Sequence, residues 1–129
     1  MTTRLPADAV RAWARLIRVE QTLLGNVEAD LEAAGLPPLV WYDVLLELRR
    51  AADGRLRHRD LHSRMLLAKY SLSRLIDRME AEALVERIPC ADDGRGAHIA
   101  ITSGGLAMQR RMWPVYARSI ERHFAGRLT

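Results

Sequence analysis

The sequence predicts a mainly helical protein with a small β wing, and three observations lead to this fold class. Two long segments, 7–34 and 103–126, carry apolar residues at the three- and four-residue spacing of amphipathic helices. Two short amphipathic segments between them are separated by only about three residues, which is typical of a helix-turn-helix. An alternating pair of segments around a Gly-containing loop then indicates a β-hairpin. Residues 38–101 are therefore predicted to form a winged helix-turn-helix flanked by long N- and C-terminal helices.

The composition indicates one soluble domain, residues 1–129. The chain is long enough to bury a core, and its 49% apolar and 28% charged residues are ordinary for a globular protein. No apolar run is long enough for a transmembrane helix, and the N-terminal ten residues lack the apolar core of a signal peptide. The single cysteine, Cys90, excludes an intrachain disulfide and fits a reducing compartment. We therefore expect a cytoplasmic protein.

The long helix predicted for 7–34 has an a/d-like apolar stripe interrupted by Glu20. The stripe consists of Val10, Trp13, Ile17, Leu24, Val27 and Leu31. It is wide enough to pack against another long helix, either in the same chain or in a partner. Gly35 provides a C-terminal stop, and Pro37 and Pro38 prevent continuation of the helix.

Two helices are expected between the long N-terminal helix and the second helix of the helix-turn-helix, and the later of the two is the first helix of that motif. Residues 38–52 form one of them, and its apolar residues are Leu39, Trp41, Tyr42, Leu45 and Leu48. A turn at 52–56 follows, with Leu56 in a very short strand. The next helix, 59–66, is expected to direct Leu61, Met65 and Leu66 into the core.

The second helix of the helix-turn-helix is expected to begin at Lys69 or Tyr70, and its buried side consists of Leu72, Leu75, Ile76 and Met79. Strands are expected at 84–89 and 97–101. Thr102 or Ser103 can cap the last helix, which Pro114 is expected to bend. The apolar residues of that helix, at heptad-like spacing, are Leu106, Trp113, Ile120 and Phe124.

Positive charge is concentrated in the middle of the chain. The protein has a net charge of +4, but residues 55–78 alone carry seven cations and two acids. A basic segment of this kind favours a polyanionic partner, because field and counterion release both promote binding. An Arg-rich solvated surface is the alternative that charge alone leaves open.

An ordered set of motifs runs through residues 38–105. It comprises Ser73–Arg74, the segment LIDR at 75–78, Glu80, Leu84–Val85, the loop DDGRG at 92–96, and Thr102 followed by Gly105. In this order and spacing, the set resembles the MarR family of bacterial transcription regulators. The long helix at 7–34 is similar to the family in length and pattern.

The resemblance implies a ligand-responsive repressor that acts as a homodimer on a palindromic operator in double-stranded DNA. Residues 7–34 and 103–129 would be its dimerisation helices, and 38–101 its DNA-binding region. The resemblance also implies an effector pocket for a small aromatic or phenolic compound. Candidate lining residues are Trp13, Trp41, Tyr42, Met65 and Trp113, with Arg15 and His58 as polar groups. Aromatic residues at helical spacing belong to a core more often than to a pocket.

The chemistry of DNA reading can be assigned to the helix that begins near Lys69. Arg74 can make a bidentate bond to guanine, while Ser71 and Ser73 can reach base edges or phosphate. Backbone contacts are expected from Lys69, Tyr70 and Arg78, with Arg57 and Arg64 among further phosphate-binding candidates. The alternative is a solvated helix surface on which Asp77 balances Arg74 and Arg78.

The loop at 92–96 carries Arg95 between two glycines. An arginine held clear of the core in this way can enter a narrow minor groove, where the negative potential is enhanced. An ion pair with Asp92 or Asp93 is the alternative.

Three departures from the family pattern lead to specific expectations. Ala83 replaces a Gly, and left-handed Ala costs about 1 kcal/mol, so we expect the turn to be built differently. Ala68 stands where a capping residue is common, which would weaken the helix start by about 1 kcal/mol. The sequence ends at Thr129, before a further helix that is common in the family. This predicts a smaller dimer interface, unless the sequence is cut short.

Other functions have weaker support. His58 and His62 have the i,i+4 spacing of a zinc site but no evident third ligand, so we expect no metal or cofactor. Redox sensing through Cys90 is an alternative, although the neighbouring acids would raise its thiol pKa. A winged helix that binds protein or RNA is another. No phosphate loop, nucleophile elbow or convergent acid–base group is present, so we expect no catalytic residues and no enzyme activity.

Overall fold

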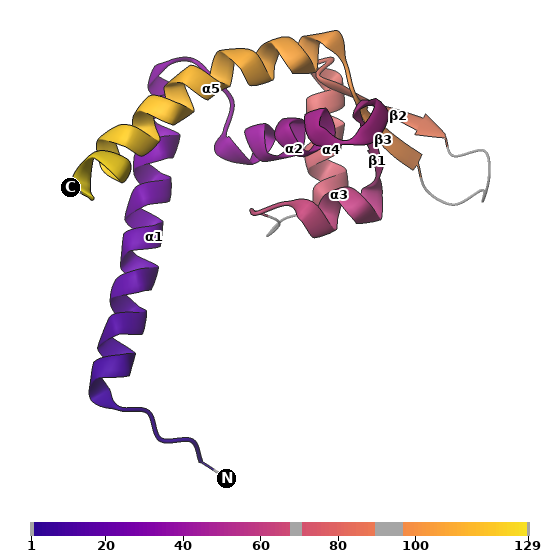
Figure 1. Ribbon diagram of the computed structural model, residues 1–129. Coiled ribbons are helices and arrows are strands. Elements are labelled where there is room, and N and C mark those ends of the chain that lie inside the picture. Colours follow the sequence, from indigo (N-terminus) through magenta and orange to yellow (C-terminus); the bar gives the residue numbers. More distant parts are fainter. Residues whose placement is uncertain (1, 68–70, 90–96, 129) are drawn as a thin grey trace.

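The computed structural model of the protein describes residues 2–67, 71–89 and 97–128 (Figure 1). The helices are α1 (Ala7–Ala33), α2 (Leu39–Arg50), α3 (His58–Arg64), α4 (Leu72–Ala81) and α5 (Ser103–His123), with short 3-10 turns at Ala52–Gly54 and Ala125–Arg127. The strands are β1 (Arg55–Arg57), β2 (Val85–Pro89) and β3 (Ala97–Ile101). They form one antiparallel sheet in the order β1-β3-β2. Ile99 of the central strand β3 pairs with Leu56 of β1 on one side and with Arg87 of β2 on the other. The predicted fold class is confirmed.

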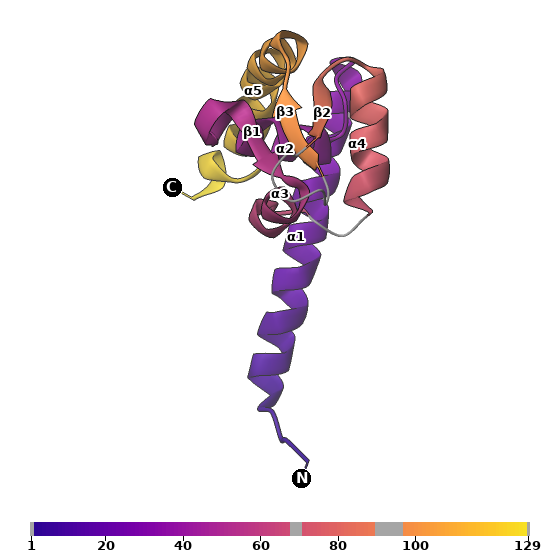
Figure 2. The same ribbon diagram turned by 90° about the vertical axis from the view of Figure 1, so that its right-hand side faces the viewer.

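The molecule has two parts with α2 between them (Figures 1 and 2). Helices α1 and α5 pack against each other at one end, and α3, α4 and the sheet lie at the other. The N-terminal half of α1 extends away from the rest of the chain in both views. No helix in the described ranges is both long and apolar enough to cross a membrane.

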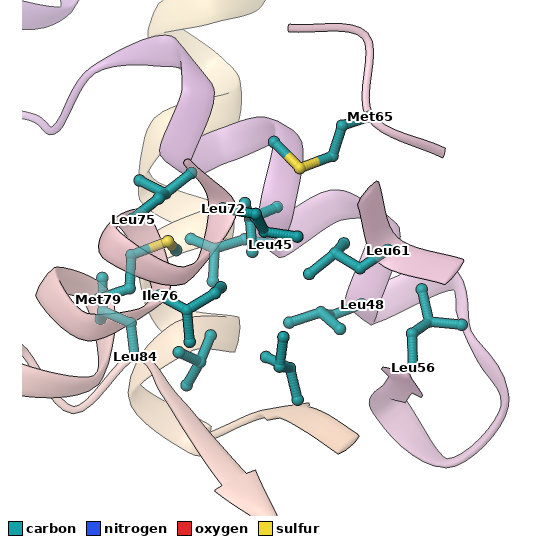
Figure 3. Close-up of a cluster of buried hydrophobic side chains, with 13 residues drawn as sticks. Leu45, Leu48, Leu56, Leu61, Met65, Leu72, Leu75, Ile76, Met79 and Leu84 are labelled. Carbon is teal, nitrogen blue, oxygen red and sulfur yellow. The ribbon is translucent and has the colours of Figure 1, made fainter. Parts of the chain in front are cut away.

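The winged part is built around one apolar core (Figure 3). Side chains from α2, α3, α4 and the strands point into a common space, and those labelled there are Leu45, Leu48, Leu56, Leu61, Met65, Leu72, Leu75, Ile76, Met79 and Leu84. Burial of a side chain of this size contributes about 1.5–3 kcal/mol. The core therefore holds α4 by one side and leaves its other side in solvent.

Helices α1 and α5 are joined by a second apolar cluster and by one carboxylate. The cluster consists of Val27, Leu31, Leu39, Tyr42 and Met112. Beside it, Asp30 accepts a hydrogen bond of 2.7 Å from the Ser119 hydroxyl and lies 3.0 Å from His123 Nε2. The Ser119 hydrogen bond is the main reason that the pKa of Asp30 lies below its usual value.

The helix-turn-helix differs from the sequence prediction at its connection. Helix α3 ends at Arg64 because Met65 is extended (φ −72°, ψ 139°), and the side chain of Leu66 is 85% exposed rather than buried. Helix α4 begins at Leu72, and the Ser71 hydroxyl accepts from the Arg74 N–H. Helix α3 thus ends two residues earlier, and α4 begins two or three residues later, than the sequence predicted. Ser71 is the N-cap of α4, whereas Ala68, where the sequence predicted a weak helix start, lies outside the described residues.

The turn after α4 is left-handed despite the absence of glycine. Ala83 has a φ of 60°, so the expectation of a differently built turn was wrong. The Leu84 N–H donates to the Met79 carbonyl and the Ala83 N–H to the Glu80 carbonyl, which is the Schellman arrangement. The Thr102 hydroxyl donates to the Ala83 carbonyl at 2.6 Å and accepts from the Gly105 N–H. Thr102, the predicted cap of α5, thereby also holds this turn in place.

The left-handed Ala83 leads to a stability prediction. Ala83→Gly removes the contact of a Cβ with the backbone, and should raise the free energy of unfolding by about 1 kcal/mol. Urea denaturation would measure the change. Ala81→Gly, two residues earlier in the right-handed part of α4, is the matched control and should lower stability by about 1 kcal/mol. A loss of stability in Ala83→Gly would contradict the assignment of strain to this residue.

Candidate nucleic-acid interface

The side of α4 that faces away from the core carries the predicted DNA-reading residues. Ser71, Ser73, Arg74 and Arg78 are all exposed, whereas Leu72, Leu75, Ile76 and Met79 are buried. Neither Arg74 nor Arg78 has an acidic partner in the part of the chain that the structure describes. Within the described ranges, both guanidinium groups are thus exposed and have no acidic partner.

Asp77 lies between these two arginines in sequence but pairs with Arg87. The distance from Arg87 Nη1 to Asp77 Oδ1 is 2.8 Å, and that to Glu80 Oε1 is 3.0 Å. This is different from the alternative in which Asp77 balances Arg74 and Arg78. Arg87 was not among the residues chosen from the sequence. Arg87 is on β2, and the sequence alone does not show that it lies close enough to α4 to pair with Asp77 and Glu80.

A second contact links α3 to α4. Ser73 Oγ lies 3.3 Å from His58 Nε2, so one of the two serines predicted to reach DNA is near a partner within the protein. Burial is the main reason that the pKa of His58 is lowered, and repulsion by His62 and Arg87 adds to the effect. His58 therefore lies at the α3–α4 junction and not in a pocket with the aromatic candidates.

The connection between α3 and α4 is held to α2 by Asp43. This carboxylate is buried, and its Oδ2 accepts from the Leu67 N–H at 2.9 Å. Burial raises the pKa of Asp43, and hydrogen bonds from the backbone N–H groups of Leu67 and Leu66 oppose this rise. Sequence reasoning missed Asp43, because its partner is 24 residues away.

Of the other predicted DNA contacts, some are described by the structure and others lie outside the described residues. Arg57, at the end of β1, and Arg64, at the end of α3, are exposed. Lys69, Tyr70 and Arg95 lie outside the described residues, as does Cys90. Among the described residues no group of three or more His, Cys, Asp or Glu is arranged to hold a metal ion.

The predicted effector residues do not form one group. Tyr42 and Trp113 are stacked with ring centroids 6.2 Å apart, and Tyr116, which was not predicted, lies 5.1 Å from Tyr42 and 5.9 Å from Trp113. The remaining candidates are elsewhere: Trp41 and Met65 pack in the core of the winged part, while Trp13 and Arg15 are exposed on α1.

A hollow of about 340 Å³ lies elsewhere, between α1 and the C-terminal end of the described chain. Its lining residues are Arg18, Val19, Thr22, Leu23, Asn26, His123 and Arg127. None of the predicted effector residues lines it.

Comparison with known proteins identifies related structures. The model of the MarR family matches residues 34–96. AbsC, a MarR family transcriptional regulator from Streptomyces coelicolor, is 33% identical, with a TM-score of 0.86 over 99% of this chain and 86% of AbsC. Sco3205, a MarR family regulator of the same organism solved in complex with DNA, is 27% identical, with a TM-score of 0.86 over 100% of this chain and 81% of Sco3205. A comparison with curated protein sequences gave no significant match.

Asp43 leads to a prediction about pH. Because folding raises its pKa, this carboxyl contributes most to stability below about pH 3.9, and the contribution is lost as the pH rises through the folded-state pKa. Asp43→Asn retains an acceptor but has no charge to bury. Its free energy of unfolding minus that of the wild type should therefore increase with pH, measured by denaturation from about pH 3 to about pH 7.

Asp43→Ala tests the hydrogen bond separately. Without an acceptor for the Leu67 N–H, stability should fall by about 1 kcal/mol. A difference between Asp43→Asn and the wild type that decreases with pH would contradict the effect of burial on this group.

Proposed function

The chain belongs to the MarR family of transcription regulators, and from this we propose that it binds double-stranded DNA sequence-specifically through α4. The observation that carries the proposal is the exposed side of α4, on which Arg74 and Arg78 have no acidic partner among the described residues. We assign Arg74 to guanine and Arg78 to phosphate, with Ser71 and Ser73 as shorter-range contacts. The DNA complex of the related Sco3205 supports this use of the fold.

The proposed interface extends beyond α4. We keep Lys69, Tyr70, Arg57 and Arg64 as candidate phosphate contacts, since a charge-dense surface beside the reading helix promotes binding to any duplex. We also keep Arg95 as a candidate for the minor groove. Because the proposed target is chromosomal DNA, we further propose a cytoplasmic location.

We propose that the active species is a homodimer. Large apolar side chains are exposed along the N-terminal half of α1 and at the end of the chain, namely Val10, Trp13, Leu16, Val19, Phe124 and Leu128. Large apolar side chains exposed in this number on one segment favour burial against a partner. Two copies joined there would present two α4 helices, and a two-fold axis between them matches a palindromic operator with half-sites about one helical turn apart.

We propose repression relieved by a small aromatic or phenolic effector. The aromatic cluster of Tyr42, Trp113 and Tyr116 supports this, because it joins α5 to α2 and Trp113 is half exposed. The Gln109 amide donates to the Tyr42 hydroxyl, and Gln109 Oε1 is buried without a partner in the described part of the chain. A phenolic O–H is a donor that could satisfy that oxygen. An effector here would act on DNA binding by favouring one spacing of the two α4 helices.

Selection of bound duplexes from a random DNA library tests the proposed function. The purified protein should enrich a palindrome with half-sites about one helical turn apart, and Arg74→Ala should cost about 1–3 kcal/mol and relax the preference at one position. Arg78→Ala is the matched control and should weaken binding to all duplexes about equally. No enrichment by a folded dimer would contradict DNA reading, and would favour an RNA or protein partner.

A second prediction concerns the dimer. Replacing Trp13 and Leu16 by Glu puts two charges on the exposed apolar side of α1, so the protein should become monomeric and lose at least tenfold in affinity for the selected duplex. Sedimentation analysis and DNA titration would measure both changes. The double variant Trp13→Phe, Leu16→Met keeps the apolar surface and should remain a dimer. A dimeric Glu variant would place the interface elsewhere.

A further inference from the structure

Arg87 connects the wing to the reading helix by four polar contacts. Its Nη1 atom lies 2.8 Å from Asp77 Oδ1 and 3.0 Å from Glu80 Oε1. Its Nη2 atom donates to the Ser73 carbonyl at 2.9 Å, and its backbone N–H donates to Glu80 Oε2 at 3.1 Å. One residue of β2 therefore holds α4 at three places along its length.

These three places determine how α4 is rotated about its axis. Ser73, Asp77 and Glu80 follow each other at four- and three-residue intervals, so they share one side of the helix over about two turns. The apolar contacts beneath α4 are non-directional and tolerate small rotations, whereas hydrogen bonds do not. A rotation of about 20° would move a side-chain group 6 Å from the axis by about 2 Å. That displacement is enough to break a bidentate bond from Arg74 to a base.

The same contacts determine which charges on α4 are free. Helix α4 contains two cations, Arg74 and Arg78, and two acids, Asp77 and Glu80. Arg87 pairs with both acids, and its own side chain is only 30% exposed. Its guanidinium is occupied by protein acceptors on both terminal nitrogens, so little of it remains for a phosphate.

We infer that Arg87 is a positioning residue for sequence recognition: it sets the orientation of α4 relative to the wing without contacting DNA itself. This inference rests on the proposed function, since it assigns to Arg87 the orientation in which Arg74 reads a base. The role requires the planar fork of arginine, because one group must reach acceptors on Ser73, Asp77 and Glu80 together. A lysine at this position keeps the charge but offers a single nitrogen.

The test compares the affinity for the selected duplex with that for an unrelated duplex over a series of salt concentrations. Arg87→Met and Arg87→Lys should each lower the affinity for the selected duplex about tenfold. Affinity for the unrelated duplex should stay within about threefold, and the salt dependence should not change. Arg49→Met removes an exposed cation from α2 and is the charge-matched control, expected to leave the ratio of the two affinities within about twofold.

Circular dichroism and sedimentation identify variants that are folded dimers. If Arg87→Met does not fold, two other variants test the inference: Arg87→Lys, and the double variant Asp77→Ala, Glu80→Ala, which removes both acidic partners from α4. Each should show the same fall in the ratio of the affinity for the selected duplex to that for the unrelated duplex. A parallel fall for both duplexes with a salt slope reduced by about one would overturn the inference and make Arg87 a phosphate contact. An unchanged ratio in all variants would also overturn it. A wild-type protein that prefers no duplex would instead overturn the proposed function.

Discussion

The burial of one side of α4 determines how the rest of the molecule can act. Its four apolar residues lie in the core formed with α2, α3 and the sheet, so the opposite side must face solvent. Burying these side chains contributes several kcal/mol in total, more than any single surface contact could offset. The exposed cations on α4 are thus held in place by the apolar residues behind them. Polar contacts from Arg87 then refine the position of a helix that the core already holds, while Asp43 holds Leu67, which follows α3, against α2.

The long helices α1 and α5 form the part of the molecule to which the winged part is attached, and we call this pair of helices the frame. Asp30 ties α1 to α5 through Ser119 and His123, while α2 contacts both the frame and the winged core. A helix gains most of its stability from packing, and the first part of α1 is exposed on almost every side, so within one chain it has little to pack against. A second copy of the chain would supply that surface. The position of each α4 would then depend on how two frames are joined.

Much of the fold could be predicted from the sequence, because periodicity and end signals are local. The apolar stripe of α4, the stop at Gly35 and the cap at Thr102 each involve residues only a few positions apart. The extent of α3 could not be predicted, because Met65 and Leu66 continue its apolar pattern. The extended backbone at Met65 accompanies a hydrogen bond from Leu67 to Asp43, a residue distant in sequence.

The candidate site was predicted less completely than the fold. Arg74 and Arg78 could be chosen because helical spacing alone places them opposite the core. Arg87 and Asp43 could not, since their roles arise from contacts between different elements. Tyr116 was missed for a similar reason: one of its two aromatic partners, Tyr42, is on another helix. The assignments of Lys69, Tyr70 and Arg95 stay predictions.

Hydroxyl-radical footprinting of the selected duplex tests the central claim most directly, namely that two α4 helices of one dimer occupy successive major grooves. The account predicts two symmetric blocks of protected backbone on one face of the duplex, with their centres about one helical turn, or 10 base pairs, apart. A single block, or uniform protection along the duplex, would contradict it.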